Sequence, residues 1–130
     1  MLISRPQDID LFIDTYHYAQ ARREIEISFW ATKRALVHFP ATKALLKEKG
    51  IQTSFNLGHD NLIVATFKLM KIDAFLNTVE STVASHKVPY LITTIANASG
   101  VYTYTMQHGF ENVGLTYNDP DLGSEVHFAA

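Results

Sequence analysis

The chain contains no cysteine, which excludes disulfide bridges, thiolate zinc sites and catalysis by a cysteine nucleophile. It also lacks any run of about 18 uncharged apolar residues, and its start, MLISRPQDID, has no apolar core of a signal peptide. Acidic and basic residues are interspersed and give a net charge of −2, which disfavours a nucleic-acid partner. We therefore expect a cytoplasmic chain, and peripheral attachment to the inner face of the membrane stays open.

Several familiar catalytic and binding motifs are also missing. The sequence has no G-x-G-x-x-G dinucleotide fingerprint, no phosphate-binding P-loop and no G-x-S-x-G nucleophile elbow. Its six histidines, at positions 17, 38, 59, 86, 108 and 127, include no helical H-x-x-x-H pair. We expect no cofactor and no bound metal.

The composition is that of an ordinary globular protein, and the sequence marks the boundaries of its expected helices and strands clearly. The 130 residues are 47% apolar and 18% charged, which suits one domain with a buried core. Stretches rich in β-branched and aromatic residues predict strands. These strands are expected at 25–30, 51–57, 72–79 and 101–107, with a fifth at 125–130.

Helices are predicted between these strands. Two stretches, PATKALLKEKG and PYLITTIANASG, begin with Pro40 or Pro89 at the first helical position and end on Gly50 or Gly100. A third, DNLIVATFKLMK, has Asp60 as the expected N-cap. Its expected apolar face consists of Leu62, Ile63, Phe67 and Met70. An amphipathic helix is also expected from about residue 7 to residue 23, ahead of the first strand.

Strands that alternate with helices of this length predict an α/β fold. We expect a Rossmann-like three-layer αβα domain at 25–130, preceded by a helical segment at 1–24. Its parallel sheet of about five strands should have the order 3-2-1-4, with the fifth strand beyond.

Ligands of such sheets bind outside the carboxyl ends of the strands, so the segments that follow the strands are the candidate site. His108 follows the fourth predicted strand between Gln107 and Gly109, and a histidine can move protons near neutral pH. Glu80 and Ser81 follow the third strand. Each has a simpler interpretation, with His108 a hydrogen-bonded turn residue and Glu80-Ser81 a polar loop.

The segment after the first strand carries positive charge. Lys33 and Arg34, in an expected loop from Trp30 to His38, could hold a phosphate or carboxylate, although surface cations are more often only solvated. For His59-Asp60, capping of the next helix is the favoured interpretation.

The combination of VYTYTMQHGFENVGLTYND with a following EVHFAA resembles the N-terminal half of GT-B glycosyltransferases. RALVHFPATKALLKEKGIQ and a VES turn precede it, and the similarity covers about residues 25–130. Within that group the chain is most similar to bacterial surface-polysaccharide and teichoic-acid enzymes, including CDP-glycerol glycerophosphotransferases. Gln107-His108-Gly109 is the one fairly specific motif.

The resemblance implies an acceptor-binding domain, with a C-terminal domain that this sequence lacks binding most of the nucleotide-activated donor. It implies that His108 is the catalytic base, that Glu80 orients the sugar or glycerol-phosphate acceptor, and that Lys33 and Arg34 meet donor phosphates. Trp30, Lys33, His38, Glu80 and His108 should then line an open, concave surface.

Two other classes of function stay open on the sequence alone. The chain could be a stand-alone Rossmann-like or flavodoxin-like module that binds a small ligand without catalysis. It could also be an interaction domain that pairs with a second copy or a partner chain along an exposed edge.

Overall fold

The structure is a computed structural model, and it describes residues 1–22, 24–78 and 84–106. The chain forms two compact units, Met1–Gly58 and His59–Ala130. Each described unit combines α-helices with a parallel sheet, which confirms the predicted α/β class. No helix within the described ranges is long and apolar enough to cross a membrane.

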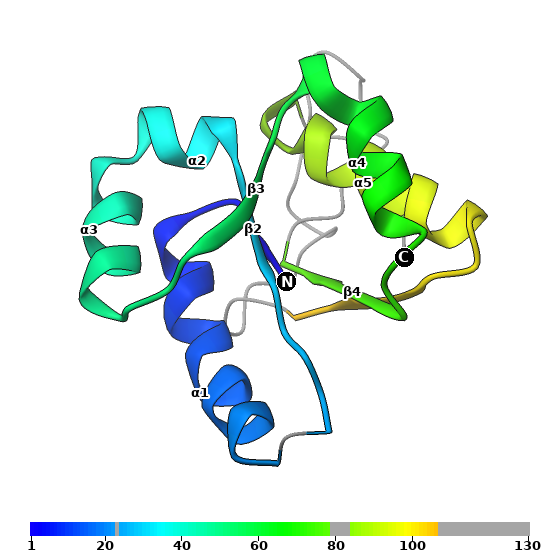
Figure 1. Ribbon diagram of the computed structural model, residues 1–130. Helices are drawn as coiled ribbons and strands as arrows, with labels where there is room; N and C mark the ends of the chain where they lie inside the picture. Colours follow the sequence, from blue (N-terminus) through cyan, green and yellow to red (C-terminus); the bar gives the residue numbers. More distant parts are fainter. Residues whose placement is uncertain (23, 79–83, 107–130) are drawn as a thin grey trace, which may run out of the picture. The chain divides into compact units, whose positions relative to one another are not determined.

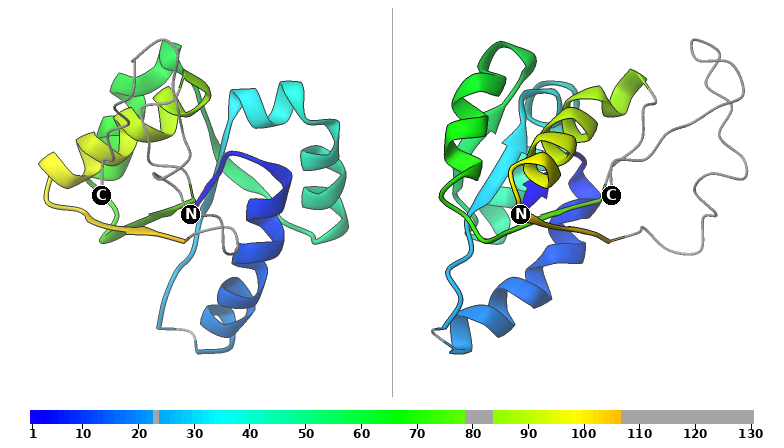
Figure 2. Two further views of the ribbon diagram at one scale, coloured as in Figure 1. Left: turned by 180° about the vertical axis from the view of Figure 1, so that it is seen from behind. Right: turned by 90° about the vertical axis from the view of Figure 1, so that its right-hand side faces the viewer.

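The first unit has a three-stranded parallel sheet in the order β1-β2-β3 (Figure 1). Its elements are β1 Leu2–Ile3, α1 Pro6–Arg22, β2 Phe29–Thr32, α2 Lys33–His38, α3 Pro40–Glu48 and β3 Thr53–Leu57. Helices α1 and α3 contact each other and lie on the same side of this sheet in both orientations (Figure 2). The predicted N-terminal helix is confirmed, because α1 buries Ile9, Phe12 and Ala19.

The central strand β2 differs from the strand predicted at 25–30. Residues 25–28 are not in a strand, and Ile25 is exposed, whereas all four residues of β2 are buried. The central strand of a parallel sheet is covered on both faces, so it is marked by a continuous apolar run rather than by alternation. The sequence interpretation selected the alternating EIEISFW and therefore placed the start of the strand four residues too early and its end two residues too early.

Strand β1 was not predicted, and it changes the strand order. Leu2 pairs with Trp30 and Ile3 with Ala31, so β1 takes the place beside the first predicted strand that was assigned to 101–107. The order 3-2-1-4 is therefore wrong at this position. A two-residue strand is too short for a recognisable pattern. After it, the Asp8 carboxylate accepts bonds from the backbone N–H groups of Ser4 and Arg5 and fixes the turn into α1.

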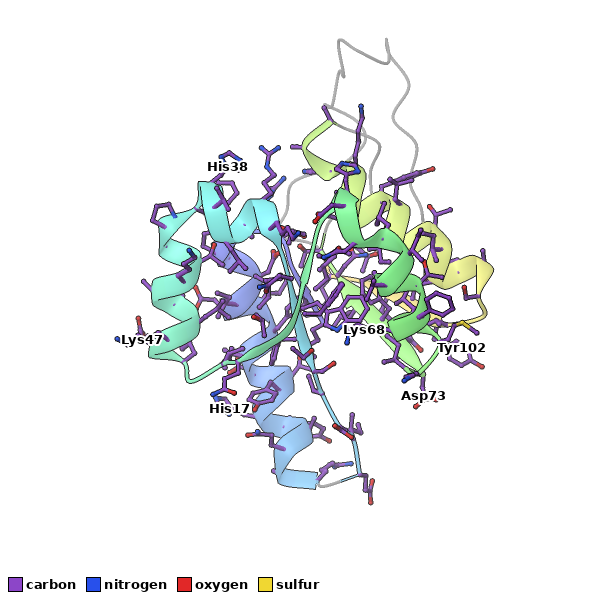
Figure 3. The ribbon with its side chains drawn as sticks, turned by 45° about the horizontal axis from the view of Figure 1, so that its top comes forward. His17, His38, Lys47, Lys68, Asp73 and Tyr102 are labelled. Atoms are coloured by element: carbon purple, nitrogen blue, oxygen red, sulfur yellow. The ribbon has the colours of Figure 1, made fainter. Side chains whose placement is uncertain are left out.

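The second unit contains a pair of parallel strands, β4 and β5. Its elements are the 3₁₀ turn η1 His59–Asn61, α4 Leu62–Leu69, β4 Ala74–Asn77, the 3₁₀ turn η2 Ala84–His86, α5 Lys87–Ala98 and β5 Tyr102–Thr105. Helix α5 packs against both strands and against α4. Figure 3 shows Tyr102 near Asp73, whose carbonyl oxygen accepts a hydrogen bond from the Tyr102 N–H at 3.1 Å where the strand pairing starts.

The C-terminal ends of α3 and α5 are confirmed in detail, as is the start of α3 at Pro40, whereas α5 begins two residues before Pro89. Gly50 and Gly100 have φ of 64° and 77°, in the left-handed region that glycine adopts without a steric cost. In α3, Ile51 N–H bonds to the Leu46 carbonyl, and in α5 Val101 N–H bonds to the Ala96 carbonyl, which are the long bonds of two Schellman motifs. The buried apolar residue after each glycine then leads the chain into β3 or β5.

Helix α4 exposes most of the face that its sequence pattern was expected to bury. Ile63, Phe67 and Met70 are exposed, while Ala65 and Leu69 are the residues packed inside. This helix is apolar on nearly all sides, so the apolar spacing alone fits two different faces. The structure selects the face that carries the small residue Ala65, which is fully buried in this unit.

The burial of Phe29 yields a stability prediction. Phe29 is 3% exposed and packs edge-to-face on the Tyr16 ring at 5.1 Å. We expect Phe29→Ala to lower the free energy of unfolding by roughly 3–5 kcal/mol, because apolar burial is lost and a cavity remains. Urea denaturation followed by the fluorescence of Trp30, the single tryptophan, measures this change.

Tyr18 supplies a matched control within the same unit. It is an aromatic residue of α1 that is 58% exposed and lies beside the Arg22 guanidinium. Tyr18→Ala should cost less than about 1 kcal/mol, the usual size of a surface cation–π contact. Equal losses for the two variants would contradict the described position of Phe29 in the core.

Candidate functional site

The candidate site begins where β4 and β5 end side by side. The two parallel strands are in register from Ala74 and Tyr102 to Asn77 and Thr105. One residue later, the Met106 N–H donates to the Asn77 carbonyl oxygen at 2.9 Å. The chain therefore leaves two neighbouring strands at the same edge of this sheet, as expected for parallel pairing.

Five predicted site residues follow these strand ends in the sequence. Glu80 and Ser81 come after β4, and Gln107, His108 and Gly109 come after β5. All five lie outside the described residues, as does the strand predicted at 125–130. Their roles therefore stay predictions, while the strand ends that precede them are described.

A buried polar network lies directly beneath this edge. Asn77, the last residue of β4, is fully buried, and its side-chain Nδ2 donates to Thr93 Oγ1 of α5. Thr93 is also fully buried, and its hydroxyl donates to the Pro89 carbonyl oxygen at 2.8 Å. The network thus joins the end of β4 to the first turns of α5.

A second contact holds β5 to the same helix. The Thr103 hydroxyl donates to the side-chain oxygen of Asn97, near the C-terminal end of α5. Phe75, fully covered in β4, pairs with Thr103 in the strand register. Both strands are therefore fixed against α5 by polar bonds as well as by apolar packing.

The predicted cations of the first unit lie in a helix, not in a loop. Strand β2 ends at Thr32, whose Oγ1 accepts the Ala35 N–H at 3.0 Å and caps α2. Lys33 and Arg34 are exposed in the first turn of α2. His38 is exposed at the last residue of this helix (Figure 3). Arg34 and His38 are four residues apart and so share one face of the helix.

Trp30 was predicted to line an open surface, and this prediction is wrong. It is 5% exposed, belongs to the central strand β2, and packs its ring edge-to-face on Phe55 at 5.1 Å. A large aromatic residue in a fully covered strand is part of the core. The prediction erred because it placed the end of the strand two residues too early.

The capping role of Asp60 is also corrected. Asp60 lies within η1, and Asn61 is the residue that precedes the first turn of α4. The Asn61 side chain makes no capping hydrogen bond to this helix. A short 3₁₀ turn therefore leads the chain into α4 in place of a side-chain cap.

The electrostatics of the described residues give no sign of a metal centre. No group of three or more histidine, cysteine, aspartate or glutamate side chains in the described ranges could hold a metal ion. Burial lowers the pKa of the Met1 amino group to about 6. That group lies at the amino end of β1, where it donates to the Ser28 carbonyl oxygen at 2.8 Å.

Comparison with known proteins gives no relative. No protein-family model, curated protein or solved structure matches the chain.

The Asn77–Thr93 bond predicts a specific response to removal of one hydroxyl. Thr93→Val keeps the side-chain shape but takes the acceptor away from the buried Asn77 amide. We expect a loss of about 1–3 kcal/mol in the free energy of unfolding, the desolvation cost of an unpaired buried polar group. Denaturation followed by circular dichroism measures it.

Thr42 offers the matched control for this substitution. It is a fully buried threonine of α3 whose hydroxyl has no hydrogen-bond partner among the described residues. Thr42→Val should therefore leave stability unchanged or raise it, because a buried hydroxyl without a partner is removed. A larger loss for Thr42→Val than for Thr93→Val would contradict this assignment of the bonds.

Proposed function

We propose that the chain is the acceptor-binding N-terminal domain of a glycosyltransferase or glycerophosphotransferase. The enzyme uses a nucleotide-activated donor in bacterial surface-polysaccharide synthesis, and a separate C-terminal domain binds most of that donor. The same proposal assigns residues 25–130 to one Rossmann-like three-layer αβα domain. Its parallel sheet has about five strands. The enzyme works in the cytoplasm or on the inner face of the membrane.

The observation that supports this proposal is that the parallel strands β4 and β5 end side by side. The two strands end at Asn77 and Thr105, which are register partners. In the sequence, Glu80 follows β4 and Gln107-His108-Gly109, the motif on which the resemblance depends, follows β5. Parallel sheets bind their ligands outside the carboxyl ends of their strands, and this edge supports an acceptor site there.

The proposed chemistry is a transfer to an acceptor hydroxyl. The imidazole of His108 takes the hydroxyl proton while the oxygen forms a bond to the activated carbon or phosphorus of the donor. The bond from that atom to the nucleotide breaks, and the nucleotide leaves with the electron pair. Glu80 and Ser81 orient the acceptor through hydrogen bonds, and the backbone at Gly109 allows close approach.

The cations of α2 have a role in the same scheme. Lys33 and Arg34 are exposed just after the end of β2. Such cations can meet the negative charge that develops on the departing nucleotide. His38, on the same helical face as Arg34, adds a further donor for phosphate oxygens.

A second candidate function is supported by the exposed face of α4. Ile63, Phe67 and Met70 are 76%, 64% and 69% exposed, which is unusual for three large apolar residues on one short helix. This favours an interaction domain that docks onto a partner chain through α4. In that case the segment around His108 would have no chemical role.

Nucleotide binding by the isolated chain separates a transferase domain from a stand-alone module. If most of the donor site belongs to another domain, the 130-residue chain should show weak or no binding of UDP-glucose and CDP-glycerol. Isothermal titration calorimetry measures this. Tight, saturable binding of either nucleotide would favour the stand-alone small-ligand module.

The role of His108 is tested by substitution in a protein that carries both the acceptor and the donor half. His108→Ala should lower turnover by about 10²–10⁴-fold, the usual contribution of a general base. The assay follows nucleotide release from the donor in the presence of the acceptor. The thermal midpoint should stay nearly unchanged, since a histidine at a turn adds little to the core.

His17 provides the control for this experiment. It is an exposed histidine of α1 with no proposed role, so His17→Ala should leave turnover as it was. If His108→Ala retains near-normal turnover but melts at a lower temperature, His108 is a structural turn residue and the catalytic assignment is wrong.

A further inference from the structure

Helix α4 and its C-cap residue carry an exposed apolar stripe. It consists of Ile63, Val64, Phe67 and Met70, which are four of the ten exposed large apolar side chains in the described ranges. The four residues recur at helical spacing, so they share one side of the helix. At a rise of about 1.5 Å per residue, the stripe is about 10 Å long.

The opposite side of α4 is the one that faces the core of its own unit. Ala65 and Leu69 are fully buried, and α4 contacts α5. Each of these two residues is two positions away from Phe67, which places it about 160° further round the helix. A helix that is apolar on both sides is normally covered on both sides. The core of the unit covers only one of them, so the stripe has the composition of a contact surface.

The charges at the two ends of the stripe indicate what kind of partner it fits. Asp60 lies three residues before Ile63, and Lys71 follows Met70 directly. Both charged residues are exposed. One end of the stripe is therefore acidic and the other end basic. A surface of this kind is complementary to a copy of itself that is rotated by half a turn, because each acidic end then faces a basic end.

We propose that α4 pairs with the α4 helix of a second copy of the chain, antiparallel about a two-fold axis. In this pair the two stripes cover each other, and Asp60 of each copy lies opposite Lys71 of the other. The inference assigns a partner to the exposed face of α4 and does not depend on the chain being a transferase domain. Four side chains from each copy make a small interface, so we expect a dissociation constant on the order of tens of micromolar.

Other partners fit the stripe less well. An anionic bilayer would be repelled by the exposed carboxylates of Asp60 and Asp73, which lie near its two ends. An unrelated chain would have to supply an apolar strip of the same length with the two charges in reverse order. A second copy carries this pattern in its own sequence, because an isologous interface uses the same patch twice.

The mass of the chain in solution tests the pairing. Sedimentation equilibrium from about 1 to about 500 μM, a range that brackets the expected dissociation constant, should show a monomer that becomes a dimer. Phe67→Glu should raise the dissociation constant at least about tenfold, because a charge enters an apolar contact. Val37→Glu is the matched control, since Val37 is an exposed apolar residue of α2, and it should dimerise like the native chain. A monomer over the whole range, or a dimer that Phe67→Glu leaves intact, would overturn the pairing.

Charge reversal tests the antiparallel arrangement without changing the stripe. Asp60→Lys and Lys71→Asp each turn an attraction into a repulsion at both ends of the pair, so each should raise the dissociation constant about 3–10-fold at low salt. An equimolar mixture of the two variants again places opposite charges across the interface, so it should dimerise as tightly as the native chain. A parallel pair would place Asp60 beside Asp60, and neither reversal alone would weaken it. A mixture that dimerises no more tightly than the separate variants would overturn the arrangement.

A membrane partner would give a different set of results. The chain would then stay monomeric and float with phosphatidylglycerol vesicles, Phe67→Glu would abolish the flotation, and the pairing would be wrong. These measurements use no donor or acceptor and change no residue to which the proposed transferase assigns a role. Failure of the pairing would therefore leave the proposed function as it stands, and near-normal turnover of His108→Ala would leave the dimer as it stands.

Discussion

Parallel pairing of β4 with β5 is the constraint on which the candidate site depends. Parallel strands run in the same direction, so both must end at the same edge and the connection between them must return along α5. Residues that are 28 positions apart in the sequence, Asn77 and Thr105, thereby become register partners. An antiparallel pairing of the same two strands would have placed their exits at opposite ends.

Helix α5 converts this pairing into a defined local geometry. The Schellman turn at Gly100 reverses the chain at one end of the helix, and buried Val101 leads it into β5. In the middle of the helix, Thr93 accepts a hydrogen bond from the Asn77 amide. Thus the helix is fixed to the sheet by a backbone turn at its C-terminal end and by a side-chain bond in its middle, which limits sliding and rotation.

Much of the fold could be predicted because its signals are local. The ends of α3 and α5 are marked by a proline near the start and a glycine after the end, since proline has a fixed φ and glycine readily adopts a positive one. The limits of β2 were missed because burial on both faces removes the alternation that marks a half-exposed strand. The two-residue β1 has no pattern of its own and forms only because β2 is beside it.

For the candidate site too, features with local signals could be predicted, whereas contacts between distant residues could not. The expectation that candidate residues follow strand ends comes from a general property of parallel sheets, and in the sequence both candidate segments follow β4 and β5. The Asn77–Thr93 pair could not be inferred, because it joins residues 16 positions apart and depends on how α5 rotates over the sheet. The sequence signal was an asparagine directly after the apolar run Ala74 to Leu76. A polar residue that interrupts such a strand near its carboxyl end is therefore a specific reason to ask what its side chain holds in place.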